Sequence, residues 1–280
     1  MKIAMPEELR AEVPQTSWGK VLTSTPVVMT VIATLLAGLA SNEMIRAQTD
    51  RALGAQLQSK VGDQWNYYQS KKLRSAMQRS SMELLLATFD VPSLGKSAVE
   101  QIPSPALSPL DANIQTAIAA VEMQRSEIEV AAILKRTDDK ALAAALQTAR
   151  DQSRDFNIAL GPANQALQQL EKSAPVGDKS AARGLAVARM RFAARRYDVE
   201  AELNQNIANL LELQVRKANL SAERHQQRSG EFFCGMLAAQ AAVIIATFAL
   251  AARQRNALWT LAALAGVAAI AFAGYVYLWH

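Results

Sequence analysis

The sequence predicts an all-α integral membrane protein with three transmembrane helices and a long-helix domain between the first and the second. Three apolar stretches predict the membrane helices, because each has about the 20 residues that a helix needs to cross a bilayer. They are 21–40, 231–252 and 257–279. The chain from 41 to 230 has the composition of helices and no alternating run of β-branched residues that would predict a strand. We expect it to form an antiparallel coiled coil or four-helix bundle.

The first apolar stretch has two interpretations. It contains Pro26 and several threonines, which membrane helices tolerate because neighbouring groups satisfy the freed backbone. It also ends in Gly38-Leu39-Ala40, which is a plausible cleavage site for a secretory signal. The N-terminal tail, 1–20, carries Glu7, Glu8 and Glu12 and is unlike the short basic region of such a signal. A membrane helix is therefore our first interpretation.

The composition argues against several classes of function. The chain has one cysteine, Cys234, and two histidines, so neither an internal disulfide nor a Cys/His zinc cluster can form. A net charge of +5 is modest for 280 residues and does not suggest nucleic acid as a partner. No Ser/His/Asp order, glycine-rich phosphate loop or metal-ligand spacing stands out. We therefore expect no enzyme, no catalytic residue, no metal and no cofactor.

The first half of the 41–230 domain predicts two helices around a loop. The first helix continues from the membrane to about Asp90, and one face carries Leu53, Leu57, Val61, Trp65, Tyr68 and Ala76. Four prolines predict a long loop over 91–110. A single second helix is then expected to run through Ile114 and Ile128 to a stop at Arg136.

The second half of this domain predicts two further helices. Thr137-Asp138-Asp139 supplies an N-cap for the third, which Gly161-Pro162 stops or kinks. The fourth runs from about Lys179 to Arg228 and on into the membrane. Hydrophobic residues seven apart predict a coiled-coil seam along it, at Leu185, Phe192, Val199, Leu213 and Leu220. Asn206 and Lys217 fall on this seam, where single polar residues fix register or the number of partners.

An aromatic and basic cluster, DQWNYYQSKKLR, lies at 63–74. One interpretation is structural: Trp65 and Tyr68 belong to the helix seam, and the basic residues form its solvated flank. The other is a surface for a partner helix, a lipid headgroup or a small ligand, because aromatic and basic anchors are enriched at interaction sites. The candidate surface consists of Trp65, Tyr67, Tyr68, Lys71 and Lys72.

Around this cluster the chain resembles a family of bacterial membrane proteins known only as a domain of unknown function. The resemblance rests on the stretch from Ser17 to Met44 followed by Asp63-Gln64-Trp65, the aromatic pair Tyr67 and Tyr68, then Gln69 and Lys71. It implies a multi-pass protein of the bacterial inner membrane, without a known activity.

The short turn at 253–256 predicts the orientation. It contains Arg253 and Arg255, and positively charged short loops favour the cytoplasmic side. The large domain is then expected in the periplasm. Arginines also crowd the domain side of the membrane stretches, but long translocated domains escape the charge rule.

These patterns leave several functions open. We expect a non-enzymatic, membrane-anchored scaffold that forms homo-oligomers and contacts membrane lipids, since small residues such as Gly266 allow close helix contact in lipid. Ala262, Ala269 and Ala273 share that pattern. One alternative is a periplasmic ligand sensor, similar in layout to chemoreceptor ligand domains, that acts through an unidentified protein partner. Another is a channel-like subunit with its helical domain in the cytoplasm, which resembles biopolymer-transport and flagellar stator motors.

Overall fold

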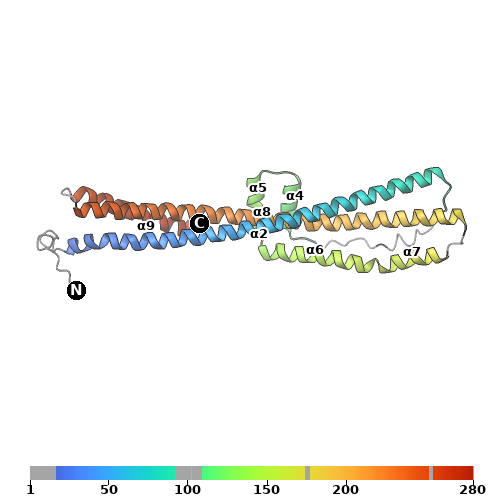
Figure 1. Ribbon diagram of the computed structural model, residues 1–280, viewed down its shortest axis with the longest axis horizontal. Coiled ribbons are helices and arrows are strands. Elements are labelled where there is room, and N and C mark those ends of the chain that lie inside the picture. Colours follow the sequence, from blue (N-terminus) through green and yellow to red (C-terminus); the bar gives the residue numbers. More distant parts are fainter. Residues whose placement is uncertain (1–16, 93–101, 103–108, 174–176, 252–254, 280) are drawn as a thin grey trace. The chain divides into compact units, whose positions relative to one another are not determined.

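The computed structural model describes residues 17–92, 102, 109–173, 177–251 and 255–279, and every regular element within these ranges is an α-helix. The prediction of an all-α chain is therefore confirmed. The helices are α2 (Ser17–Thr88), α4 (Ala112–Glu122), α5 (Glu127–Arg136), α6 (Asp139–Ala159), α7 (Gly161–Ser173), α8 (Lys179–Ala251) and α9 (Arg255–Trp279) (Figure 1).

The chain divides into two compact units. Unit 1 comprises Met1–Arg51 and Leu220–His280, and unit 2 comprises Ala52–Asn219. Helices α2 and α8, of 72 and 73 residues, contribute to both units. Each carries an apolar stretch long enough to cross a membrane, whereas the described part of α9 has a shorter apolar stretch, Thr260–Phe272.

Unit 1 has small residues inside and large apolar residues outside. Ala33 of α2, Ala239 of α8 and Ala269 of α9 form one buried cluster, and Leu36, Ala40 and Phe232 form another. The outward side chains are large and apolar on all three helices. They include Val31 and Leu35 on α2, Ile244 and Phe248 on α8, and Leu264 and Val267 on α9. Water-soluble proteins bury most of their large apolar side chains, whereas unit 1 buries mainly alanines, with Leu36 and Phe232 as exceptions.

Unit 2 packs its helices on α8. Phe156, Leu160 and Ala163 from the α6–α7 region meet Phe192, Val199 and Leu203 of α8 in one buried cluster, which also holds Ile102. The Ser75 hydroxyl of α2 donates to the Ala194 carbonyl at 3.1 Å. Glu171 of α7 forms an ion pair with Arg189. These contacts bring α2, α6 and α7 against the same helix.

The expected apolar face of α2 was partly wrong. Val61 is buried and Tyr68 is half-buried, but Leu53 and Ala76 are exposed. The buried positions instead lie seven residues apart at Ala47, Gly54 and Val61, and Ser75 follows fourteen residues later. Small residues dominate this stripe because α8 lies close against it: a Cβ added at Gly54 would approach Asn219 Oδ1 to 2.8 Å.

The single helix expected up to Arg136 is two helices, α4 and α5. Between them Gln124 adopts a φ of +52°, a left-handed conformation that no residue inside an α-helix takes. The next helix begins at Ser126, whose hydroxyl accepts from the backbone N–H of Glu129 at 3.4 Å. Acidic residues in the first turn of α5 favour a start there, since the positive end of the helix dipole stabilises their negative charges.

Other predicted boundaries are confirmed. Asp138 caps α6 by accepting from the backbone N–H of Ala141 at 3.3 Å, and α6 gives way to α7 at Gly161. Helix α8 begins at Lys179, after Asp178 accepts from the N–H of Ser180. Residues 91, 92, 109 and 110 of the predicted loop are not helical, while 93–101 and 103–108 lie outside the described residues.

Candidate functional site

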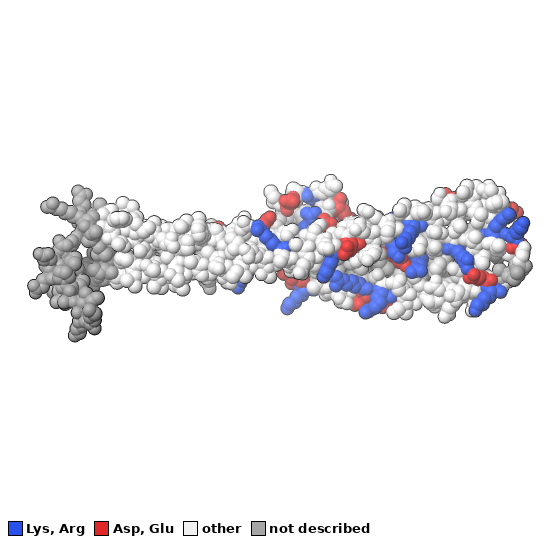
Figure 2. Space-filling model, viewed as in Figure 1, with Lys and Arg blue, Asp and Glu red and all other residues white. Residues whose placement is uncertain are grey.

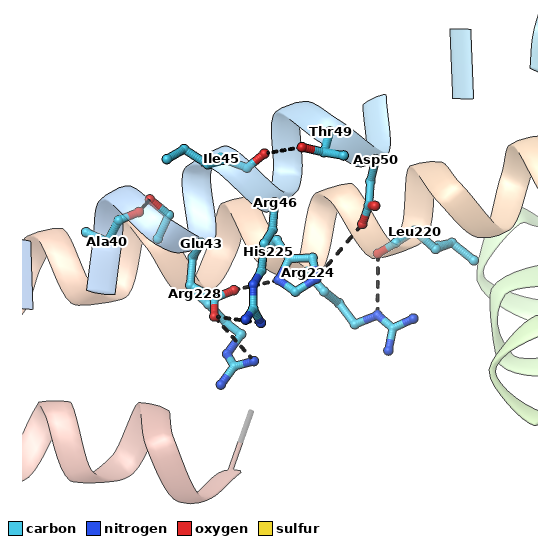
Figure 3. Close-up of polar contacts among 11 residues, drawn as sticks. Ala40, Glu43, Ile45, Arg46, Thr49, Asp50, Leu220, Arg224, His225 and Arg228 are labelled. Atoms are coloured by element: carbon cyan, nitrogen blue, oxygen red, sulfur yellow. Dashed lines mark hydrogen bonds and ion pairs between the residues drawn. The ribbon is translucent and has the colours of Figure 1, made fainter. Parts of the chain in front are cut away.

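A group of charged side chains joins α2 to α8 in unit 1 (Figure 3). It consists of Glu43, Arg46 and Asp50 from α2 and His225 and Arg228 from α8, and we name it the His225 cluster. Its α2 residues follow the apolar stretch that ends at Ala40, and its α8 residues precede the one that begins at Phe232. The two helices therefore present their charges together, at the same end of their apolar stretches.

Glu43 is the centre of the cluster. Only 6% of this residue is exposed, and its Oε2 lies 2.5 Å from Nδ1 of His225. Its Oε1 lies 3.8 Å from Nη1 of Arg228 and 3.9 Å from Nη1 of Arg46. A buried carboxylate is costly unless cations and hydrogen bonds compensate for the water it has lost. Glu43 has one close partner and two cations at a longer distance.

His225 lies between two carboxylates. Its Nδ1 faces Glu43, and its Nε2 lies 3.9 Å from Oδ2 of Asp50. A neutral imidazole has one N–H, whereas an imidazolium donates from both nitrogens. The contact with Asp50 is too long for a hydrogen bond, so Glu43 is the one close partner of the ring among these two acids. Among the described residues no group of His, Cys, Asp and Glu is arranged to hold a metal ion.

Two further contacts surround the cluster. Ser229, which is buried, donates its hydroxyl to the Ala40 carbonyl at 2.8 Å. Arg51 donates to the side-chain oxygen of Gln226. Because each contact joins one position of α2 to one of α8, they hold the two helices in register on either side of Glu43. Within the cluster the Arg228 Nε atom is buried without a hydrogen-bond partner.

The predicted aromatic and basic surface lies in unit 2 and is only partly a surface. Trp65 and Tyr68 are half-buried and make an edge-to-face contact, with ring centroids 5.5 Å apart. Lys71 pairs with Glu200, and its Nζ lies 5.2 Å from the ring centre of Tyr197. Tyr67 and Lys72 are exposed. The five residues therefore divide between a structural contact with α8 and solvent.

The predicted oligomer or register residues lie against other helices of the same chain. Lys217 donates to the Thr137 carbonyl, and its Nζ lies 2.7 Å from Oδ1 of Asp139, so it ties α8 to the start of α6. Asn206 is half-buried and lines a groove between α4 and α8. Gly266 of α9 lies against Met29, because an added Cβ would come within 2.5 Å of the Met29 Cε atom.

The His225 cluster was missed at the level of the sequence, although a signal for it exists. Buried or half-buried residues of α8 recur at alternating steps of four and three from Ala218 to Ala246, and His225 is one of them. On α2, Glu43 and Asp50 are seven residues apart, three residues after Ala40 and Ala47, which are buried. Charged residues on two such stripes indicate polar contacts between the helices.

These features define an all-helical protein in which two helices are long and apolar enough to cross a membrane. Residues 18–161, more than half of the chain, match a family model described as a domain of unknown function (DUF4337), and the chain belongs to this family. The predicted membership of an uncharacterised family is thus confirmed. Comparison with curated proteins and with solved structures gave no match.

Proposed function

We propose that this protein is a membrane-anchored helical scaffold of the bacterial inner membrane, which self-associates and catalyses no reaction. Helices α2, α8 and α9 span the bilayer, and unit 2 lies outside it. The observation that carries the proposal is the packing of unit 1, with alanines inside and large apolar side chains outside.

Lipid is the environment that fits this packing. Val27 is 66% exposed, Phe248 65% and Leu264 69%, and each comes from a different helix. In water such a surface would be a severe aggregation liability, whereas in lipid it costs nothing and small residues let the helices approach closely. On the face drawn in Figure 2 the described apolar part of unit 1 is almost entirely white, while charged residues gather over unit 2.

The charged residues of unit 2 support a scaffold more than an enzyme. Glu200, which is buried, contacts both Lys71 and Arg196, and Asp198, also buried, contacts Arg79. Lys217 contacts the backbone of Thr137. These groups hold helices together, so they are engaged in structure instead of being presented in a cleft.

The orientation proposed for unit 2 is periplasmic. Arg253 and Arg255 lie in the sequence between the two C-terminal apolar stretches, and short positively charged connections stay in the cytoplasm. The part of the chain that precedes the apolar stretch of α8, which includes unit 2, is then periplasmic. The reverse orientation belongs to the channel-like alternative.

The His225 cluster favours a second candidate function, a sensor that acts through a partner protein. Glu43 lies within 4 Å of three side chains, those of His225, Arg228 and Arg46. Exchange among these partners allows a small shift between α2 and α8 without leaving the carboxylate unpaired. A ligand that favours one of two such arrangements would shift their populations.

Two measurements test these proposals. The mass of the full chain in native-membrane nanodiscs should correspond to an oligomer, and a monomer would contradict the scaffold. For orientation, Cys234 is replaced by Ser and Met123, which is 68% exposed in the α4–α5 turn, by Cys. A membrane-impermeant thiol reagent should label intact spheroplasts. Protection before lysis would place unit 2 in the cytoplasm and favour the channel-like alternative.

A further inference from the structure

A groove in unit 1 runs along the outward side of α2 and α8. Its volume is about 440 Å³, and it is lined by Thr30, Ala33, Thr34, Ala37, Gln240, Val243 and Ile244. Gln240 lies eight residues beyond Phe232, which is about 12 Å along the helix at 1.5 Å per residue. Because the apolar stretch of α8 runs from Phe232 to the end of the helix at Ala251, Gln240 lies near its middle.

Gln240 is an amide in an apolar environment. Its side chain is exposed, and it makes no hydrogen bond to any residue that the structure describes. In water an exposed amide is satisfied by solvent, but the middle of a bilayer contains no water to serve as donor or acceptor. An unpaired amide there is costly, so Gln240 requires a partner from outside the chain.

The opposite wall of the groove offers acceptors. The Thr30 hydroxyl donates to the Pro26 carbonyl at 2.8 Å, and the Thr34 hydroxyl donates to the Thr30 carbonyl at 2.9 Å. Each hydroxyl proton is therefore used within α2, while the oxygen keeps lone pairs that can accept. Ala37 and the buried Ala33 are the other α2 residues of the groove, and the small, half-buried side chain of Ala37 permits close approach of a second helix.

We propose that this groove is the contact surface between two copies of this chain, paired as a symmetric dimer through Gln240. An amide carries both a donor and an acceptor, so the same group on a two-fold axis satisfies itself. One N–H of each Gln240 amide pairs with the amide oxygen of the other copy, and the threonine oxygens of that copy accept the second N–H. The inference rests on the proposed self-association and assigns its surface.

A second copy fits this groove better than the lipid does. Acyl chains offer neither donors nor acceptors, so they leave the Gln240 amide unpaired. The small-residue face of α9 is not available for the same role, because Ala262 and Ala269 are buried within the chain and Gly266 lies against Met29. The groove combines the small side chain of Ala37 with polar groups of matching chemistry.

Cysteine cross-linking in native membranes tests the surface. In a Cys234→Ser background, Ile244→Cys places a thiol in the groove, and Leu261→Cys places one on α9 as a control. The native side chains are matched in exposure, at 56% and 54%. With a thiol oxidant such as copper phenanthroline, Ile244→Cys should give a disulfide-linked species of twice the chain mass, and Leu261→Cys should not.

The amide is tested by Gln240→Leu, with Thr247→Val as a control that removes a polar group outside the groove. Loss of hydrogen bonds between membrane helices should weaken the dimer about 3- to 30-fold. Gln240→Asn, which keeps the amide, should restore part of it, and Thr247→Val should change nothing. A circular dichroism spectrum and melting temperature like those of the unchanged chain would show that Gln240→Leu still folds.

Each other outcome has a definite meaning. Two results would overturn the groove as the contact surface while the proposed self-association stands. One is an oligomer that cross-links at Leu261→Cys but not at Ile244→Cys, and the other is an oligomer that Gln240→Leu does not weaken. A cross-linked product of another mass assigns the groove to a different protein and overturns the inference. A monomeric native chain overturns both proposals.

Discussion

His225 and Glu43 are 182 positions apart in the chain, yet Nδ1 of the one lies 2.5 Å from Oε2 of the other. The contact joins two helices that each continue into an apolar stretch. It places a pair of ionisable groups beside the buried alanines Ala40 and Ala47 of α2, so any change in the pair acts on the packing of both helices.

Replacing His225 with Leu should destabilise the chain. Glu43 would keep only the cations of Arg46 and Arg228, at 3.8–3.9 Å, and we expect a loss of about 1–3 kcal/mol. The double variant Glu43→Leu/His225→Leu should recover much of it, because no carboxylate is then buried. Melting temperatures of the four members of this cycle in detergent measure the coupling. Additive effects would contradict a direct interaction.

Two adjacent lysines provide a matched test of the aromatic and basic cluster. Lys71 is 22% exposed and pairs with the buried Glu200, whereas Lys72 is exposed. Lys71→Met should lower the stability of unit 2 by about 1–3 kcal/mol, and Lys72→Met by less than about 0.5 kcal/mol. Thermal unfolding followed by tryptophan fluorescence distinguishes the two. Equal effects would favour the alternative in which both lysines serve a surface.

Lys217 should matter through the backbone more than through its acidic partner. The Asp139 side chain is 82% exposed, so Asp139→Asn should change the free energy of unfolding by less than about 0.5 kcal/mol. Lys217→Met removes the donor to the Thr137 carbonyl and should cost about 1–2 kcal/mol. Denaturant titration of both variants checks this order. A larger effect for Asp139→Asn would show that the ion pair dominates.

The turn between α4 and α5 should be improved by glycine. Gln124 has a φ of +52°, a conformation that glycine adopts without a steric cost. Gln124→Gly should raise the stability by about 0.5 kcal/mol, and Gln124→Val should lower it by about 1 kcal/mol or more, because a β-branched residue fits this region poorly. Melting temperatures should therefore rise for Gln124→Gly and fall for Gln124→Val. If a continuous helix ran through this position, Gln124→Gly would instead be the more destabilising of the two changes.

The membrane role of α9 can be tested by two leucines of equal exposure. Leu264 in α9 and Leu84 in α2 are both 69% exposed. Leu264→Arg should disfavour insertion of α9 by about 3 kcal/mol, since a charge is costly at the centre of a bilayer. Helices α2 and α8 would still hold the protein in the membrane, so the measurement is protease cleavage of α9 in sealed vesicles, which Leu264→Arg should permit. Leu84→Arg, in unit 2, should leave α9 protected. Protection of α9 in both variants would contradict a span by α9.

The sequence allowed the helical class and several boundaries to be predicted because their signals are local. Asp138 and Gly161 act on their own neighbours, so the ends of α6 and the start of α7 followed from them. The α4–α5 turn was missed since Met123, Gln124 and Arg125 contain no glycine or proline. A local signal for the break did exist in Ser126, which caps α5 ahead of an acidic first turn, but the left-handed conformation of Gln124 itself had none.

The site was harder to predict than the fold. The search for a binding surface favoured aromatic residues, and it led to Trp65 and Lys71. In the structure Trp65 contacts Tyr68 and Lys71 contacts Glu200 of α8, all within unit 2. The His225 cluster depends on pairing two helices across the whole chain. Only when α2 and α8 are aligned do Glu43 and His225 meet, and that alignment rests on a stripe of alanines, glycine and serine that hydrophobicity alone does not reveal.

The alanine-lined interior of unit 1 has a calorimetric consequence. Large positive heat-capacity changes on unfolding arise when apolar surface becomes exposed to water. If α2, α8 and α9 separate within a bilayer, their outward leucines and phenylalanines stay in hydrocarbon and the inner alanines enter it, so little apolar surface is hydrated. A calorimetric scan of the reconstituted protein should therefore report almost entirely on Ala52–Asn219.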